Sequence, residues 1–356
     1  MALQADDYAD LAINTLADLG EGKFTDNITK YQDTVALKKV ISQEQVKKQA
    51  GKSVDFNIMT DHNNSAEFVG LAYTVNPGIK SVLDKGTVPW RRMRYDYAWE
   101  YDLLAMNRSP RQIVNFMQTQ RIAGHASGIV KLEQFLWRAP TLADDLSPYG
   151  LPYWIVKSST AFTSGPTGNY GFNGLTPQDH TTVAGIDPDI ETRWRNYAEP
   201  YTAVTQDDVV KKMRRAMHYT NFKPIVNEVP EYAGRESREV YTNWTTLEPL
   251  EVLLKAQNDD LGNDLDPTGG KAMIRRAKLQ AVRELDDDTT NPIYGIDWST
   301  IDIIALQDRW MHEDRFAKKP DQPSVGFVNV HCTFNTVCYD RRKNWVLSNG
   351  TTELSW

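Results

Sequence analysis

Histidine, serine and acidic residues are the side chains with which this chain could do chemistry. Six histidines are scattered through it, and no two have the helical spacing that holds zinc; they are His62, His125, His180, His218, His312 and His331. The stretch around Ser127 has two flanking glycines, but the serine is displaced from the nucleophile position of a hydrolase elbow. One alternative stays open, a cytoplasmic metal-dependent hydrolase that uses His62 or His331 with aspartates from elsewhere in the chain.

Two acidic stretches have the composition of cation sites. Residues 264–269 begin like a calcium loop, but position twelve is Arg275, where a bidentate glutamate is required. Asp286, Asp287 and Asp288 are adjacent in a polar stretch, where carboxylates face water. We therefore expect a turn at the first stretch and a solvated loop at the second.

The only cysteines, Cys332 and Cys338, lie in an alternating stretch. On one strand they would share a face about 20 Å apart, which excludes a disulfide. His331 beside them is not enough for a structural zinc site. The sequence thus predicts no catalytic, metal-binding or cofactor-binding residues, and no cofactor.

A glycine-rich span runs to Gly185 and includes Gly165, Gly168, Gly171 and Gly174. Its spacing fits neither a dinucleotide fingerprint nor a phosphate loop. It predicts a flexible surface loop.

The bulk composition narrows the class of protein. The chain has 356 residues, 24% of them charged and 40% hydrophobic, which is ordinary for a folded protein and long enough for two subdomains. A net charge of −7 argues against a dedicated nucleic-acid-binding protein. Three basic clusters are expected to be solvated faces: Arg91, Arg92 and Arg94; Lys211, Lys212, Arg214 and Arg215; Arg341, Arg342 and Lys343. The acidic N-terminus and the lack of a long apolar run predict no signal peptide and no membrane partner.

The elements that must position these side chains centre on one long helix. Ser109 is a good N-cap and Pro110 suits the first helical position, so residues 110–138 are predicted to form a helix of roughly 43 Å. Its middle, residues 123–128, consists mostly of small residues, so another backbone should be able to cross closely there.

A strand hairpin with a long tip is predicted before this helix. Val54, Phe56 and Ile58 alternate with polar residues, and residues 93–103 alternate more strongly, with aromatic residues at odd positions. The two strands are expected to pair, leaving residues 59–88 as an irregular tip. Loops this long usually have a function, here contact with a neighbouring molecule.

The remaining pattern predicts further helices and strands. Helices are expected at residues 8–19, at 205–217 with a capping box from Thr205 to Asp208, and at 246–261. Strands are expected at 149–156, 278–285, 292–304 and 325–338, and a turn at 340–343 should return the last one through 345–347.

The order of these elements resembles the major capsid protein of tailed double-stranded DNA bacteriophages, with its Hong Kong 97-type fold. Three stretches also resemble phage and prophage capsid sequences: Pro152-Tyr153-Trp154-Ile155-Val156, Trp194-Arg195-Asn196-Tyr197 with Val204-Thr205-Gln206-Asp207-Asp208, and Phe334-Asn335-Thr336-Val337-Cys338-Tyr339-Asp340-Arg341-Arg342-Lys343-Asn344.

The resemblance implies an α+β chain in five parts. They are an N-terminal arm (1–50), an extended loop (51–106), a peripheral domain (107–239) with the spine helix 110–138, an axial domain (240–309), and return strands of the peripheral domain with the C-terminus (310–356). No charged helical scaffolding segment precedes the arm, so a separate scaffold, or none, is expected.

The function that the resemblance implies is structural rather than enzymatic. Such chains self-assemble as homo-oligomers, hexamers and pentamers, into the icosahedral shell of a virion that encloses DNA with little specific binding. Assembly in the host cytoplasm and contact with separate portal and decoration proteins are further expectations. Lys80 and Lys85 lie in the extended loop, but nothing selects a crosslinking partner for them. An encapsulin-like compartment shell, or a tail or baseplate component, stays open beside the hydrolase.

Overall fold

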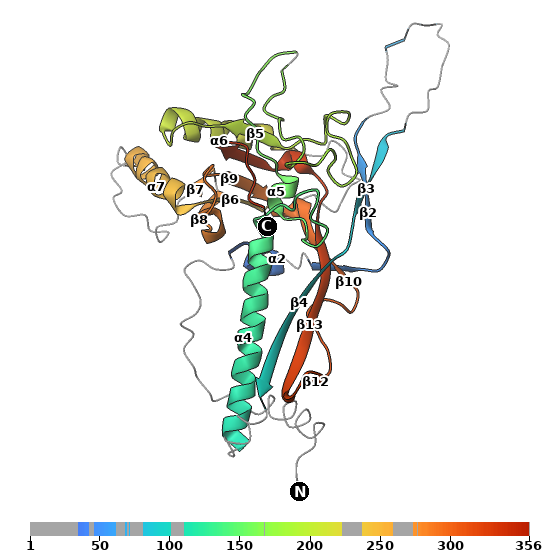
Figure 1. Ribbon diagram of the computed structural model, residues 1–356. Helices are drawn as coiled ribbons and strands as arrows, with labels where there is room; N and C mark the ends of the chain where they lie inside the picture. Colours follow the sequence, from blue (N-terminus) through green and yellow to red (C-terminus); the bar gives the residue numbers. More distant parts are fainter. Residues whose placement is uncertain are drawn as a thin grey trace.

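The computed structural model describes residues 35–42, 46–61, 68–69, 71, 81–100, 110–166, 168–222, 237–258, 273–275 and 277–355. Figure 1 shows a wide head from which a narrow blade, made of α4, β4 and β13, extends in one direction. A separate hairpin of β2 and β3 projects beside the head. The predicted helix at residues 8–19 lies outside the described residues.

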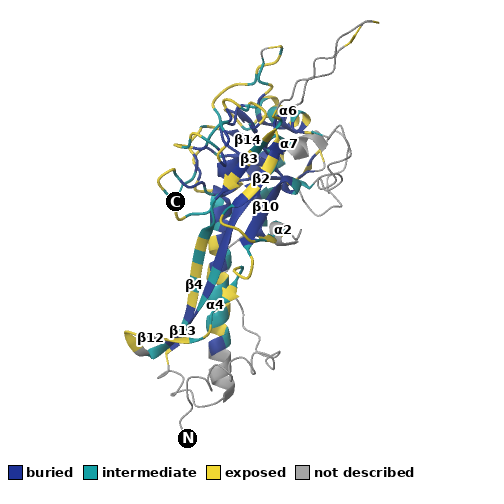
Figure 2. Cartoon of the chain, turned by 90° about the vertical axis from the view of Figure 1, so that its right-hand side faces the viewer, coloured by how far each residue is buried: buried dark blue, intermediate teal, exposed yellow. Residues whose placement is uncertain are grey.

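The blade contains the predicted long helix and strand. Helix α4 spans Pro110–Leu136, so the predicted helix is confirmed with its C-terminal end two residues earlier. Strand β4 (Arg91–Glu100) runs antiparallel to β13 (Gln322–Cys338), from Arg91 opposite Phe334 to Glu100 opposite Val325. Figure 2 shows the alternation along β4, whose aromatic side chains face α4 while its charged side chains face solvent.

Two glycines allow α4 to approach β4. A Cβ atom on Gly124 would lie 3.0 Å from Cβ of Tyr97, and one on Gly128 would lie 2.6 Å from Cε1 of Tyr95. The small middle of the helix therefore accommodates two tyrosine side chains, where the sequence had led us to expect a crossing backbone.

One six-stranded sheet joins the blade to the head. Its order among the described residues is β1 (Val46–Gln49), β10 (Ile301–Leu306), β13 and β11 (His312–Glu313), and β12 (Ala317–Lys319) and β4 also pair with β13. The C-terminal half of α4 packs on this sheet through Leu132, Phe135 and Leu136. Helix α2 (Val35–Ser42) is attached to α4 because the buried Glu133 accepts the backbone N–H groups of Ala36 and Leu37.

A second six-stranded sheet forms the rest of the head. Its order is β5 (Tyr197–Pro200), β14 (Trp345–Ser348), β9 (Ile293–Asp297), β6 (Arg238–Thr242), β8 (Ala277–Ala281) and β7 (Met273–Ile274) among the described residues. A π-helical turn (Gln206–Val210) leads into α6 (Lys211–Tyr219), and α7 spans Trp244–Asn258. Both helices bury apolar side chains on this sheet. The Thr205 side chain accepts the N–H of Asp208, as the capping box predicts.

Each of the two sheets has its own apolar core, and the residue ranges that form these cores do not coincide with the ranges that the resemblance implied. Strands of the 240–309 range share a sheet with β5 and β14, and α6 packs on that same sheet. Strand β10 of that range belongs to the first sheet instead. The five ranges stay a prediction, and we propose that α6 groups with the 240–309 strands.

Several predicted local structures are wrong. The strand expected at 292–304 is two strands, β9 and β10, which lie in different sheets on either side of a 3-10 turn (Trp298–Thr300), and the strand expected at 278–285 ends at Ala281. Strand β2 (Val54–Met59) pairs with β3 (Leu83–Val88), and not with the strand beginning at Met93, which pairs with β13. Residues 151–154 form a short buried helix, α5, with Pro152 in its first turn, where a strand was expected. Strand β14 does not return along β13 but pairs with β5 and β9.

The glycine-rich span is irregular, as predicted, but much of it is packed rather than free on the surface. A Cβ atom on Gly171 would lie 2.2 Å from the Tyr197 ring, and one on Gly174 would lie 1.9 Å from Asn196 Oδ1. The backbone of this span thus lies directly against β5.

Candidate assembly surfaces

The base of the β2–β3 hairpin is part of the main core. Val54, Phe56, Ile58 and Val88 are buried. The Phe56 ring lies 6.4 Å from Trp154, 6.3 Å from Trp194 and 5.8 Å from Tyr339, measured between ring centroids. The N–H of Thr87 also donates to the carbonyl of Ala184 at 2.9 Å. The hairpin therefore leaves the head from a fixed root.

Gly86 makes this root possible. It stands opposite Phe56 in the hairpin register, and a Cβ atom there would lie 2.4 Å from Cζ of the Phe56 ring. The aromatic ring thus lies flat over the β3 backbone, which no larger residue would allow.

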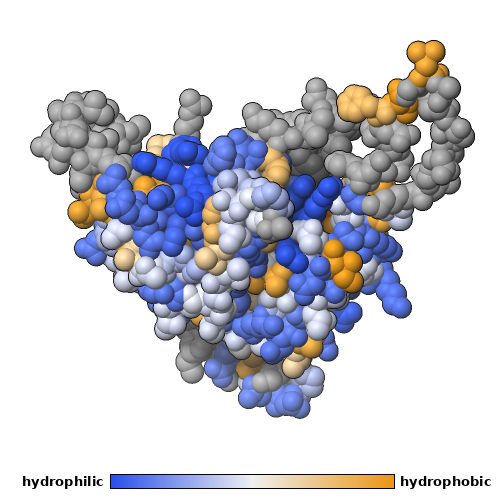
Figure 3. All heavy atoms as spheres, turned by 90° about the horizontal axis from the view of Figure 1, so that it is seen from above, coloured by the Kyte–Doolittle hydropathy of each residue, from blue (hydrophilic) through white to orange (hydrophobic). Residues whose placement is uncertain are grey.

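The tip of the hairpin is apolar and exposed. Phe68 and Leu71 have relative exposures of 110% and 111%, and Met59, Val69 and Leu83 are also exposed. Figure 3 shows hydrophobic atoms gathered at this far end of the molecule. Contiguous exposed apolar side chains mark interaction sites, because burying one large side chain gains about 1.5–3 kcal/mol. This tip is the principal candidate contact surface.

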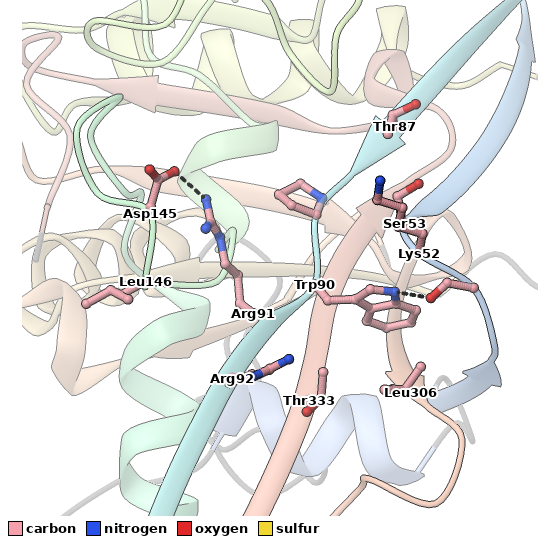
Figure 4. Close-up of a pocket in the computed structure, with 12 residues that line it drawn as sticks. Lys52, Ser53, Thr87, Trp90, Arg91, Arg92, Asp145, Leu146, Leu306 and Thr333 are labelled. Carbon is pink, nitrogen blue, oxygen red and sulfur yellow. Dashed lines mark hydrogen bonds and ion pairs between the residues drawn. The ribbon is translucent and has the colours of Figure 1, made fainter.

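A cavity of about 890 Å³ opens where the hairpin meets the blade (Figure 4). Trp90 closes one side of it and donates its indole N–H to the carbonyl of Gly51. Arg91 contacts the exposed Asp145 at 3.4 Å, and its buried Nε has no hydrogen-bond partner within the described chain. Such a cavity can accept an acidic side chain.

The described residues do not bring together the candidate hydrolase groups. Among them, His331 contacts one carboxylate, that of Asp314 at 2.7 Å, and both side chains are partly exposed. His62 lies outside the described residues. In the part of the chain that is described, no group of three His, Cys, Asp or Glu residues could hold a metal ion.

A chain of hydrogen bonds from Tyr95 through His125 to Glu313 superficially resembles a catalytic triad. The Tyr95 hydroxyl lies 2.9 Å from His125 Nδ1, and His125 Nε2 lies 2.8 Å from the Glu313 carboxylate, which Arg121 also binds through two nitrogens. Burial raises the pKa of Tyr95 to about 12, which is the opposite of activation. These hydrogen-bonded side chains connect α4 to β4 and β11, and we interpret them as a structural contact.

The acidic triplet is partly buried, contrary to the prediction of a solvated loop. Asp288 accepts a hydrogen bond from Lys157 Nζ at 2.5 Å, and Lys157 also donates to the carbonyl of Thr352. Glu353 completes the cluster by accepting the backbone N–H of Lys157, and burial raises its pKa to about 7. The cluster fastens the C-terminal segment to the head. Residues 264–269 lie outside the described residues.

The basic clusters behave differently from one another. Arg92, Arg94, Lys211 and Arg214 are exposed, as expected. In the third cluster the prediction of a solvated face is wrong, because Arg341 is 0% and Lys343 is 7% exposed. Arg341 donates to the carbonyls of Trp154, Trp194 and Leu175 at 2.6–2.9 Å and to Asn196 Oδ1 at 3.2 Å.

The two cysteines lack the lowered pKa of a reactive thiol. Cys332 and Cys338 are free, as the spacing predicts, and both are buried. Burial raises the pKa of the Cys338 thiol to about 12.

None of the described helices is both long and apolar enough to cross a membrane.

Sequence reasoning identified the long tip but not the side chains that make it a contact surface. Phe68, Val69 and Leu71 lie in a stretch without periodicity, where apolar residues are not expected to pack into a core. Apolar residues without periodicity were the available signal. The Lys157 cluster had no comparable signal, because its members are far apart in the sequence.

Comparison with known proteins gives a likeness in structure alone. No family model matches the chain, and no curated protein matches its sequence. A chain from the capsid asymmetric unit of cyanophage A-1(L) matches with a TM-score of 0.61 and 13% identity, over 95% of this chain and 99% of that one. A chain from the capsid of an empty GTA particle matches with a TM-score of 0.52 and 11% identity, over 92% of this chain and 99% of that one. The chain therefore has the Hong Kong 97-like fold of phage capsid proteins.

Proposed function

We propose that this chain is the structural subunit of an icosahedral phage head, and that it assembles into pentamers and hexamers around packaged DNA. The observation that carries the proposal is the hairpin, which is rooted in the core of its own subunit and exposes apolar side chains at its tip. A second subunit is the natural cover for such a tip, because every copy presents both the tip and the surface that receives it.

The resemblance to phage capsid proteins also implies separate roles for the parts of the subunit. The second-sheet strands of the 240–309 range, with α6 and α7, would meet their copies around the five- and six-fold axes. The blade of α4, β4 and β13 would lie between neighbouring subunits and receive a hairpin. The finished subunit belongs to the virion, and no step in this role requires a catalytic residue.

The test is electron microscopy and light scattering of the purified chain and of a double variant, Phe68→Ser with Leu71→Ser. The unaltered chain should form capsomer rings or closed shells. The variant should stay smaller than a ring at the same concentration, while its melting temperature stays within about 2 °C because the side chains touch nothing in their own subunit.

A matched control changes two exposed apolar residues on the body, Leu142→Ser with Ile190→Ser, which are 60% and 75% exposed. If both double variants assemble as well as the unaltered chain, the tip is not the contact. If the unaltered chain is a monomer or dimer at all concentrations, also when expressed with its neighbouring genes, the shell function is wrong.

A further inference from the structure

A second cavity, of about 620 Å³, lies at one end of the second sheet. Strands β6 and β8 begin there and β9 ends there, beside the last turn of α6.

The walls of this cavity carry more positive than negative charge. Its cationic side chains are Lys39, Arg238, Arg275, Lys278 and Lys343, and its one acidic side chain is Glu239. Lys39 already binds Glu239 at 2.7 Å. The side chains of Arg275, Lys278 and Lys343 make no hydrogen bond or ion pair with any described residue, so no described acidic side chain compensates these three positive charges.

Lys343 is the least expected of the three. It ends the turn Arg341–Lys343, directly before β14, and only 7% of it is exposed. Most of the Lys343 side chain is thus packed in the protein, while its ammonium group is not among the buried unpartnered atoms and lines the cavity. A lysine held in place along its stem offers its ammonium group to an anion in the cavity.

Arg238 offers a second donor in the same cavity. Its Nη2 donates to Asn221 Oδ1 at 3.0 Å, but its buried Nε has no hydrogen-bond partner among the described residues. The nearest carboxylate oxygen, Oδ2 of Asp297, is 3.8 Å away and is itself without a partner. Arg238 and Asp297 thus form a long ion pair, and the partly exposed guanidinium group lines the cavity.

We infer that this cavity binds phosphate groups. A single carboxylate would neutralise one of the three unpaired cations, whereas a phosphate dianion, or successive phosphodiesters of a nucleic acid, would neutralise more. A guanidinium group and an ammonium group together are also the donor pair that phosphate recognition uses, the first for directional hydrogen bonds and the second as a point charge. Exposed Arg275 and Lys278 at the rim would contact neighbouring phosphates.

The inference is tested by isothermal titration calorimetry on the full chain at constant ionic strength. Three probes are titrated: inorganic phosphate, a twelve-nucleotide oligo-dT, and a polyglutamate peptide of equal charge. We expect Lys343→Met to weaken phosphate binding about tenfold or more, since it removes a charged donor and keeps the side-chain volume. Arg275→Gln with Lys278→Gln should weaken oligo-dT binding more than phosphate binding.

The matched control removes two exposed lysines outside the cavity, Lys48→Gln with Lys211→Gln, and should leave binding of all probes unchanged. Binding of phosphate alone supports a free phosphate ion as the ligand, and binding of both phosphate and oligo-dT supports a nucleic-acid backbone. The inference is overturned if polyglutamate binds more tightly than phosphate and oligo-dT, if neither phosphate probe binds, or if the control pair loses as much binding as the rim pair. Because the rim variant alters only exposed residues, a folding defect in Lys343→Met leaves the test intact.

Discussion

The two faces of the β2–β3 hairpin differ in their surroundings. Val54, Ile58 and Val88 on the inward face are at most 8% exposed, whereas the paired residues Met59 and Leu83 on the outward face are 61% and 58% exposed. The inward face packs on the core at the root, and the outward face has apolar surface that the described chain does not cover. We therefore expect the stability of the fold and the proposed assembly to depend on different residues of one element.

The largest effect on stability is expected in the head, behind the root. Arg341→Met should lower the free energy of unfolding by about 3–5 kcal/mol, because it leaves several buried carbonyl groups without a donor. Chemical denaturation followed by tryptophan fluorescence measures this loss. Arg342→Met removes a partly exposed neighbour and should cost below about 1 kcal/mol. Equal losses in the two variants would show that the hydrogen bonds of Arg341 are not what matters.

A smaller effect is expected at the root itself. Gly86→Val should cost about 2–3 kcal/mol, because the new side chain meets the Phe56 ring and must displace it. Thermal unfolding would report the change as a lower melting temperature. The adjacent exposed position gives the control, since Lys85→Val faces away from the core and should leave the melting temperature nearly unchanged. A tolerated Gly86→Val would mean that the root is looser than its contacts indicate.

The third effect depends on pH and concerns Glu353. Its pKa is raised from 4.5 to about 7 by burial, so the folded chain favours the protonated carboxyl group. The stabilising contribution is complete below pH 4.5 and is lost as the pH rises through about 7, by on the order of 3 kcal/mol. Glu353→Gln, which mimics the protonated form, should flatten this part of the stability curve between pH 5 and pH 8.

The control for this titration is the exposed Glu248, whose replacement by glutamine should leave the pH dependence unchanged. If the unaltered chain and Glu353→Gln have parallel stability curves, Glu353 does not titrate in this range.

Much of the blade could be predicted from the sequence, because α4 and β4 have long, regular periodicities. Strand β3 could not, since Leu83-Asp84-Lys85-Gly86-Thr87-Val88 contains two charges and a glycine. It is a strand because Phe56 packs over Gly86, which is a tertiary contact. The partners of β14 were missed for a similar reason, because a turn in the sequence does not determine which sheet the next strand joins.

The features of the candidate surfaces were also predictable from the sequence only in part. An extended tip followed from loop length, whereas the buried state of Arg341 did not, since a charged triplet is usually solvated. Its acceptors come from residues 154, 174–175 and 194–196, which only the folded chain brings together. Local patterns reveal elements, but a buried charge is determined by groups that are distant in sequence.

The antiparallel pairing of β4 with β13 also has a consequence for biosynthesis. At the end of this pairing the Asn335 side chain donates to the carbonyl of Pro89, across 246 positions of the chain. Contacts of such separation close slowly and late, because a long loop must be ordered first. Strand β4 can pair with β13 only when almost the whole polypeptide has left the ribosome. A truncated or stalled chain would therefore lack a finished blade, which in the proposed shell would exclude incomplete subunits.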